Sequence, residues 1–121
     1  MKSKCITDSD GTKRWKLNGK YHREDGPAIE YPNGYKAWYL NDKLHRTDGP
    51  AIEFANGNKS WCINGKYHRT DGPAVEYTNG NKHWYINGEE LTFKQWLSEV
   101  WNTLSKEEQV KYAFNGFEYE E

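Results

Sequence analysis

The chain has 121 residues, a formal net charge of −1 at pH 7 and an apolar content of only 35%, and aromatic residues make up 16% of the chain. This length predicts one domain, and the balanced charge argues against a strongly basic nucleic-acid-binding module. Because aliphatic side chains are few, we expect the large aromatic rings to provide most of the apolar burial. No apolar run approaches membrane-spanning length, and residues 1–10 have no signal-peptide core. We therefore expect a cytoplasmic protein in which Cys5 and Cys62 are free thiols.

One motif, His-Arg-x-Asp-Gly-Pro-Ala-x-Glu, occurs three times at a constant spacing of 23 residues, beginning at His22, His45 and His68. A period of this length predicts a stacked repeat architecture. The full unit also contains a Gly-x-Lys-x-Trp segment, an Asn-Gly pair after it and a second Asn-Gly pair at its end. Three complete units precede a partial fourth, which stops after Gly88. The tryptophans that mark the four units are Trp15, Trp38, Trp61 and Trp84.

Each unit holds two short segments that are predicted to be extended. The first covers residues 13–17 and its equivalents 36–40, 59–63 and 82–86, and it runs into an Asn-Gly pair typical of a type I′ hairpin turn. The second covers residues 28–31, 51–54 and 74–77, after an Asp-Gly-Pro turn. We expect an antiparallel meander with two strands per unit, in which equivalent residues of successive units lie about 10 Å apart.

The unit resembles the MORN repeat family. The matching residues are Gly-x-Lys-x-Trp-Tyr-x-Asn-Gly-Lys-x-His and the closing Glu-Tyr-x-Asn-Gly, and they cover roughly residues 10–88. The usual His-Gly-x-Gly of that family is replaced by His-Arg-x-Asp-Gly-Pro-Ala, which is similar to the divergent MORN-like repeats of bacteriophages and large DNA viruses. The resemblance implies successive β-hairpins in an elongated, twisted sheet. It also implies a scaffolding, dimerising or lipid-associated module without a shared catalytic site.

The periodicity changes from Thr92 onward. Apolar residues then follow helical spacing, which predicts one broad face of an amphipathic helix; they are Phe93, Trp96, Leu97, Val100, Trp101 and Leu104. Thr92 with Gln95, and Ser105 with Glu108, fit two capping boxes, and the second predicts a helix over residues 106–114 that ends at Asn115-Gly116. We expect a single domain, residues 1–121, composed of hairpin repeats (10–88), a helical cap (92–115) and an acidic tail (116–121). The alternative to a purely covering cap is a partner-binding helix that presents Trp96 and Trp101.

Three equivalent histidines suggest a metal site, but a spacing of about 10 Å prevents one ion from joining two of them. We therefore predict no metal and no cofactor. Three equal copies of His-Arg-x-Asp also favour a structural task over catalysis, because an active site needs one convergent pocket with distinct roles. The predicted structural residues are the four tryptophans, His22, His45 and His68, and Asp25, Asp48 and Asp71. The arginines Arg23, Arg46 and Arg69 are expected to clamp the turn or to bridge to a neighbouring carboxylate.

The leading hypothesis is a non-enzymatic protein–protein interaction module, a homodimer or a binder of another protein. The viral resemblance implies a bacteriophage protein with a host-directed, anti-defence role in the host cytoplasm. Specificity is expected at positions that vary between units, and partly exposed tyrosines are expected to act as anchors. The alternative is a small-ligand sponge that holds a nucleotide-like anion through its arginine and aromatic rows. The candidate binding residues are Lys16, Tyr39, Cys62, Tyr85, Arg23, Arg46, Arg69, Trp96 and Trp101, with Tyr21, Tyr35 and Tyr67 as further exposed rings.

Overall fold

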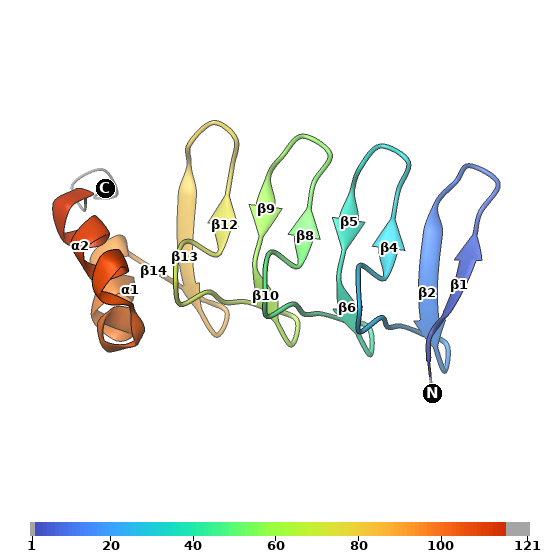
Figure 1. Ribbon diagram of the computed structural model, residues 1–121, viewed down its shortest axis with the longest axis horizontal. Helices are drawn as coiled ribbons and strands as arrows, with labels where there is room; N and C mark the ends of the chain where they lie inside the picture. Colours follow the sequence, from blue (N-terminus) through green and yellow to red (C-terminus); the bar gives the residue numbers. More distant parts are fainter. Residues whose placement is uncertain (1, 116–121) are drawn as a thin grey trace.

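The computed structural model describes residues 2–115, which form an elongated row of antiparallel hairpins closed at one end by helices (Figure 1). Within these residues the main sheet has ten strands, in the order β1-β2-β4-β5-β8-β9-β12-β13-β14 with β3 paired to β2, and β6–β7 and β10–β11 form two small hairpins beside it. The predicted fold class is therefore confirmed. The strands are β1 Lys4–Thr7, β2 Lys13–Leu17, β3 Lys20–Tyr21, β4 Ile29–Glu30, β5 Lys36–Ala37, β6 Tyr39–Leu40, β7 Lys43–Leu44, β8 Ile52–Glu53, β9 Lys59–Ser60, β10 Cys62–Ile63, β11 Lys66–Tyr67, β12 Val75–Glu76, β13 Lys82–Ile86 and β14 Glu89–Leu91.

Each long strand changes its pairing partner at the tryptophan. Residues of β2 before Trp15 pair with β4, and residues after it pair with β3. In the second unit the Trp38 N–H donates to the Ala51 carbonyl at 2.8 Å, and the Trp38 carbonyl accepts from the His45 N–H at 3.0 Å. The chain follows the same path there, although β5 and β6 are separate strands. The prediction of two extended segments per unit missed the third, a two-residue strand after the turn that follows each of Trp15, Trp38 and Trp61.

The turns that join the long strand to this short strand have the predicted geometry. Asn18 and Gly19 both have positive φ, 53° and 78°, as a type I′ turn requires. In the second unit an aspartate replaces the glycine, and Asn41 and Asp42 adopt φ values of 50° and 65°. The Asp42 carboxylate also accepts a hydrogen bond from the Tyr21 N–H at 2.7 Å, which ties this turn to the preceding unit.

Lysine and glutamate alternate across the sheet on one of its faces. Cross-strand partners share a face, and successive residues of a strand point to opposite faces. Each lysine of this row is therefore next to a glutamate, and a one-residue slip would break every pair at once. The tryptophans lie two residues beyond the lysines and thus on the same face, which we name the Trp face. The row is Lys13, Glu30, Lys36, Glu53, Lys59, Glu76 and Lys82.

The centre of the sheet is packed with small side chains rather than with rings. Four alanines are fully buried, namely Ala28, Ala37, Ala51 and Ala74, whereas Trp15, Trp38 and Trp61 are only half-buried. Trp15, Trp38 and Trp61 lie on the face of a single-layer sheet, where a part of each ring stays exposed. At the cap, a buried cluster unites Trp84, Phe93, Trp96, Val100, Leu104 and Tyr112.

The helices begin as predicted. Helix α1 (Phe93–Val100) starts at a complete capping box in which Gln95 N–H donates to Thr92 Oγ1 at 3.2 Å and Thr92 N–H donates to Gln95 Oε1 at 3.0 Å. Helix α2 (Lys106–Asn115) starts at an equivalent Ser105–Glu108 box. The helical face expected to continue to Leu104 is interrupted, because residues Trp101–Thr103 form a 3-10 turn, η1. Across residues 2–115, none of the helices combines the length and the apolar character needed to cross a membrane.

Two ends of the domain differ from the sequence expectation. Strand β1 adds a complete edge strand before residue 10, and it pairs with β2 over all four of its residues. At the other end β14 pairs with β13 and closes the incomplete fourth unit before α1 begins. The predicted acidic tail, residues 116–121, lies outside the described residues.

Candidate functional site

The motif segments 22–27, 45–50 and 68–73, which we name the motif loops, fold over the Trp face. In the second loop the Arg46 guanidinium stacks on the Trp38 ring, with Cζ 3.9 Å from the ring centroid. Its Nε donates to Asp48 at 2.9 Å, and its Nη1 donates to the Pro50 carbonyl at 3.1 Å and to Glu53 at 3.1 Å. Arg46 thus binds two different carboxylates and a backbone carbonyl, rather than forming a bidentate pair with a single carboxylate.

The other two arginines repeat the stacking, the bond to the aspartate of the loop and the bond to the proline carbonyl. Their Cζ atoms lie 3.8 Å and 3.7 Å from the Trp15 and Trp61 centroids. Each guanidinium also lies against the glycine of its own loop, where an added Cβ would be 2.6 to 2.8 Å from Cζ. The Asp-Gly-Pro part of the motif therefore needs glycine for space, since the arginine is fixed between the glycine and the ring.

The histidine of each motif contacts the next unit. The Asn64 N–H donates to His45 Nδ1 at 3.1 Å, and the Asn41 N–H makes the same bond to His22. A third bond joins the Asn87 N–H to the third motif histidine at 3.0 Å. The backbone N–H of each motif arginine also donates to a carbonyl of the following unit, for example to that of Cys62 at 3.1 Å. The motif therefore locks each hairpin to the next one along the row.

The electrostatics of the motif loops are balanced. The guanidinium of Arg23 lowers the pKa of the Asp25 carboxyl through a hydrogen bond and through its charge. Arg46 lowers the pKa of Asp48 in the same way. The carboxylates thus stay ionised to lower pH than usual, and each motif arginine has an acidic partner within its own loop.

Hollows open between the motif loops on the Trp face. The largest, about 720 Å³, lies over Trp61 and Ile63, and a second of about 550 Å³ lies over Trp38 and Leu40. A smaller one of about 250 Å³ lies beside Trp15. At the fourth position the helices fill the equivalent place over Trp84, whose ring centroid is 4.5 Å from that of Trp96.

The cap is fixed to the third motif loop by two hydrogen bonds. Trp96 Nε1 donates to the Arg69 carbonyl at 2.8 Å, and the Tyr112 hydroxyl donates to the Asp71 carbonyl at 3.1 Å. Trp96 is fully buried. The prediction that α1 presents Trp96 to a partner was therefore wrong, because this ring takes the place that a motif arginine occupies in the other units. Trp101 stays half-exposed and, with Leu97, lines a shallow apolar hollow on α1.

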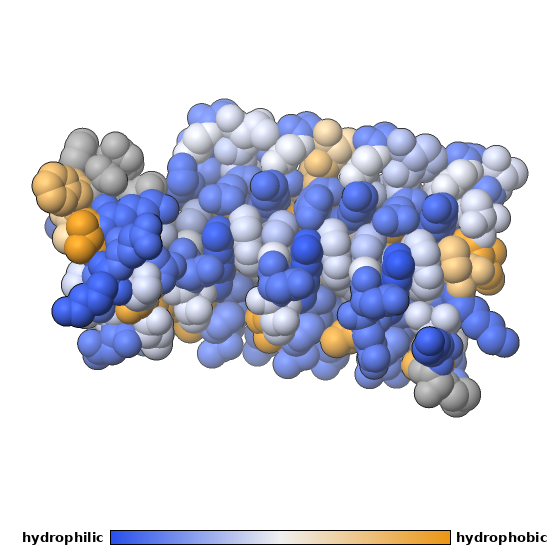
Figure 2. Space-filling view, viewed as in Figure 1, coloured by the Kyte–Doolittle hydropathy of each residue, from blue (hydrophilic) through white to orange (hydrophobic). Residues whose placement is uncertain are grey.

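Aromatic rings collect on the sheet face opposite the motif loops, which we name the aromatic face. Strand alternation and register place them there, on the side of Ile29 and Val75. The rings contact one another along the row, with centroid distances of 4.9 Å for Tyr31–Tyr35, 5.7 Å for Tyr35–Phe54 and 5.0 Å for Tyr67–Tyr85. The face contains Tyr21, Tyr31, Tyr35, Tyr39, Phe54, Tyr67, Tyr77 and Tyr85. Figure 2 shows hydrophilic and near-neutral residues in alternating columns across one side of the molecule.

The four variable positions of the repeat also lie on the aromatic face. Tyr39 and Tyr85 are partly exposed, and the Lys16 ammonium lies 4.8 Å from the Tyr21 centroid. Cys62 is only 1% exposed, and burial raises the pKa of its thiol to about 11. Cys62 is therefore too buried to contact a partner directly, whereas Lys16, Tyr39 and Tyr85 are accessible.

Sequence reasoning did not find Tyr31, Phe54 and Tyr77 as surface residues. They are equivalent positions at the ends of the second strands, and 38 to 42% of each is exposed. Their 23-residue spacing was visible, but strand alternation alone does not distinguish a covered face from an open one.

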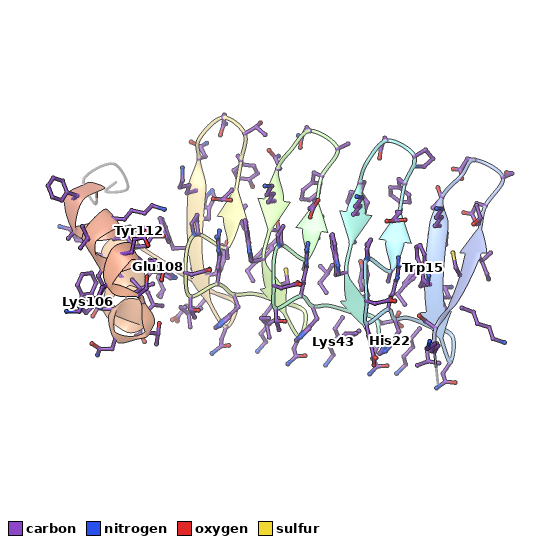
Figure 3. All side chains as sticks on the ribbon, viewed as in Figure 1. Trp15, His22, Lys43, Lys106, Glu108 and Tyr112 are labelled. Carbon is purple, nitrogen blue, oxygen red and sulfur yellow. The ribbon has the colours of Figure 1, made fainter. Side chains whose placement is uncertain are left out.

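Among residues 2–115 there is no cluster of three or more His, Cys, Asp or Glu side chains placed to hold a metal ion. Trp15 and Tyr112, which are labelled in Figure 3, lie toward opposite ends of the row of hairpins. No family model, curated protein or solved structure matches the chain.

Proposed function

We propose that the protein is a non-enzymatic interaction module that binds a protein partner through the aromatic face. The observation that carries this proposal is the set of ring groups on the sheet face opposite the motif loops, such as Tyr31–Tyr35–Phe54 and Tyr67–Tyr85. The helical cap also packs on the Trp face, since Trp96 and Tyr112 contact Trp84 there. Among the described residues, the aromatic face is therefore the sheet face that neither the motif loops nor the helices cover.

The chemistry of this face suits protein binding. Tyrosine combines a large apolar ring with a hydrogen-bonding hydroxyl and loses little side-chain entropy when it is immobilised. Ring–ring contacts such as Tyr31–Tyr35 and Tyr67–Tyr85 already restrict these side chains before a partner arrives. Pre-ordering of this kind lowers the entropic cost of association. The variable residues Lys16, Tyr39 and Tyr85 would give the surface its specificity.

The ligand-sponge alternative has less support from the geometry. It requires motif arginines that can turn toward an anion, and Arg46 is already bonded to Asp48, to Glu53 and to the Pro50 carbonyl. An added phosphate would compete with two carboxylates that hold the same guanidinium.

A host-directed, anti-defence role in a host cytoplasm is the proposal that follows from the resemblance to phage MORN-like repeats, and it assigns a host protein to the aromatic face.

Affinity capture with matched variants tests the proposal. The wild-type chain, a triple variant of the aromatic face (Tyr31→Ser, Phe54→Ser and Tyr77→Ser) and a control (Thr47→Ala and Thr70→Ala) serve as baits. The two control residues line the hollows of the Trp face. Both variants replace exposed side chains, and both leave the net charge unchanged.

The proposal predicts that one specific partner is retained by the wild type and by the control but is lost from the triple variant. Reconstitution with the purified partner then reproduces the difference in affinity. Equal retention by all three baits, or loss only from the control, would contradict the assignment of the aromatic face. A thermal-shift screen with nucleotides and cyclic dinucleotides separates the alternative, because the sponge requires stabilisation that Arg46→Lys weakens.

A further inference from the structure

The charges of the chain are distributed unevenly along the row of hairpins. Residues 1–20 contain six basic and two acidic side chains, a net charge of +4. Residues 21–88 contain eight of each sign and are neutral. Residues 89–115 contain three basic and five acidic side chains, a net charge of −2. Since β1 and the helices lie at opposite ends of the molecule (Figure 1), the elongated domain has one basic end and one acidic end.

Both ends also expose apolar side chains. At the basic end Ile6 is 61% exposed on β1. At the acidic end Val110 and Phe114 are 60% and 79% exposed on α2, and Leu97 with Trp101 lines the hollow on α1. Strongly hydrophobic residues accordingly mark both ends of the molecule in Figure 2, with smaller spots along its lower edge. Exposed apolar residues surrounded by charge are typical of interaction sites.

The basic end is also an open sheet edge. Among the described strands β1 pairs only with β2, and all four of its residues are exposed. An uncovered edge strand favours association with another chain. The opposite end of the sheet is different, because β14 leads directly into the helices that cover it (Figure 1).

We propose that copies of this chain associate head to tail, with the basic β1 end of one copy docked on the acidic helical cap of the next. Opposite charge orients the two ends, and the apolar side chains provide the contact area. Such a contact joins two different surfaces, so it extends into a linear chain of molecules unless it closes into a ring. It uses the ends of the row and leaves the aromatic face free, and it is therefore independent of the proposed partner binding.

Two charge-reversed variants test the polarity of this contact. One carries Lys2→Glu and Lys4→Glu at the basic end, and the other carries Glu99→Lys and Glu107→Lys at the cap; all four residues are exposed. Sedimentation velocity at low salt should show concentration-dependent association of the wild type, which weakens as salt screens the charges. Each variant alone should associate on the order of 100-fold more weakly, since like charges then meet at the contact.

The mixture of the two variants gives the decisive result. Each retains one intact end, and the two reversed ends are again opposite in charge, so an equimolar mixture should recover the association that each variant loses alone. A symmetric β1–β1 dimer would instead survive in the cap variant, and a symmetric cap–cap dimer would survive in the basic-end variant. Either result overturns the proposal, as does a wild type that stays monomeric at low salt and high concentration.

Disulfide trapping supplies a second readout. Cys5 is exposed and Cys62 is buried, so Cys5 is the accessible native thiol. A Ser98→Cys variant adds a thiol beside Trp101, and mild oxidation should join residues 5 and 98 of different copies. Cross-links between two copies of Cys5 alone would indicate the symmetric arrangement and contradict the proposal.

Discussion

Replacing Arg46 by alanine tests the interpretation of the motif as a lock. This guanidinium stacks on Trp38 and bonds to Asp48, Glu53 and the Pro50 carbonyl. The stacking contributes about 1 kcal/mol. The bonds to Glu53 and to the Pro50 carbonyl contribute roughly 1 kcal/mol each, and the bond to the exposed Asp48 adds little. Arg46→Ala should therefore lower the free energy of unfolding by about 3 kcal/mol, a large share of the stability of a small domain.

Urea titration followed by tryptophan fluorescence measures this loss. Arg46→Lys keeps the charge but not the planar fork, so it should recover only a minor part of the lost free energy. Lys43→Ala, which removes an exposed cation from the same unit, is the matched control and should change stability by less than about 0.5 kcal/mol. If Arg46→Ala costs no more than this control, or if lysine restores the full stability, the clamp is not what holds the motif loop.

Three further outcomes follow from the same contacts. Gly49→Ala should destabilise the protein by about 1–3 kcal/mol, because its Cβ would displace the guanidinium of Arg46. In a double-mutant cycle, Gly49→Ala should cost little further stability once Arg46→Ala has removed that guanidinium. The pKa values of Asp25 and Asp48 are lower in the folded than in the unfolded chain, so their ionised carboxylates stabilise the fold above the unfolded pKa of about 4. This stability is lost as pH falls through the folded pKa values, and the urea midpoint should therefore drop below pH 4. The drop should be smaller in a variant that carries both Asp25→Asn and Asp48→Asn. Trp96→Ala should cost about 3–5 kcal/mol, because a fully buried ring is removed from the cap; a loss under 1 kcal/mol, measured by calorimetry, would show that the cap is dispensable.

Periodicity alone predicted most of the architecture. The 23-residue spacing predicted stacked hairpins, and Asn18-Gly19 predicted the turn type from a backbone requirement. The two capping boxes predicted where the helices start. Turns and helix starts depend on residues that are close in the sequence, so local sequence patterns predict them.

The edge strand β1 was missed although the period contains it. Cys5 and Ile6 stand 23 residues before Ala28 and Ile29, and Gly11 stands 23 residues before Gly34. The match is weak because Thr7 and Asp8 replace the Glu-Tyr of the unit. Extension of the period toward the start of the chain would have found this strand.

The roles of the rings could not be assigned from spacing. Trp38 and Trp84 occupy equivalent positions, yet an arginine covers the first and a helical tryptophan covers the second. Which ring is buried depends on tertiary contacts of the cap. Likewise, exposure of Trp96 stayed open as an alternative, because the helical pattern does not show which of its aromatic residues meets the sheet.

Hydroxyl-radical footprinting of the protein with its captured partner identifies the sheet face that the partner covers. We expect protection of Tyr31, Phe54, Tyr67 and Tyr77 on complex formation, with unchanged modification of Trp38 beneath its motif loop. Protection confined to Trp38 and the other rings of the Trp face, with the tyrosines unaffected, would contradict this expectation.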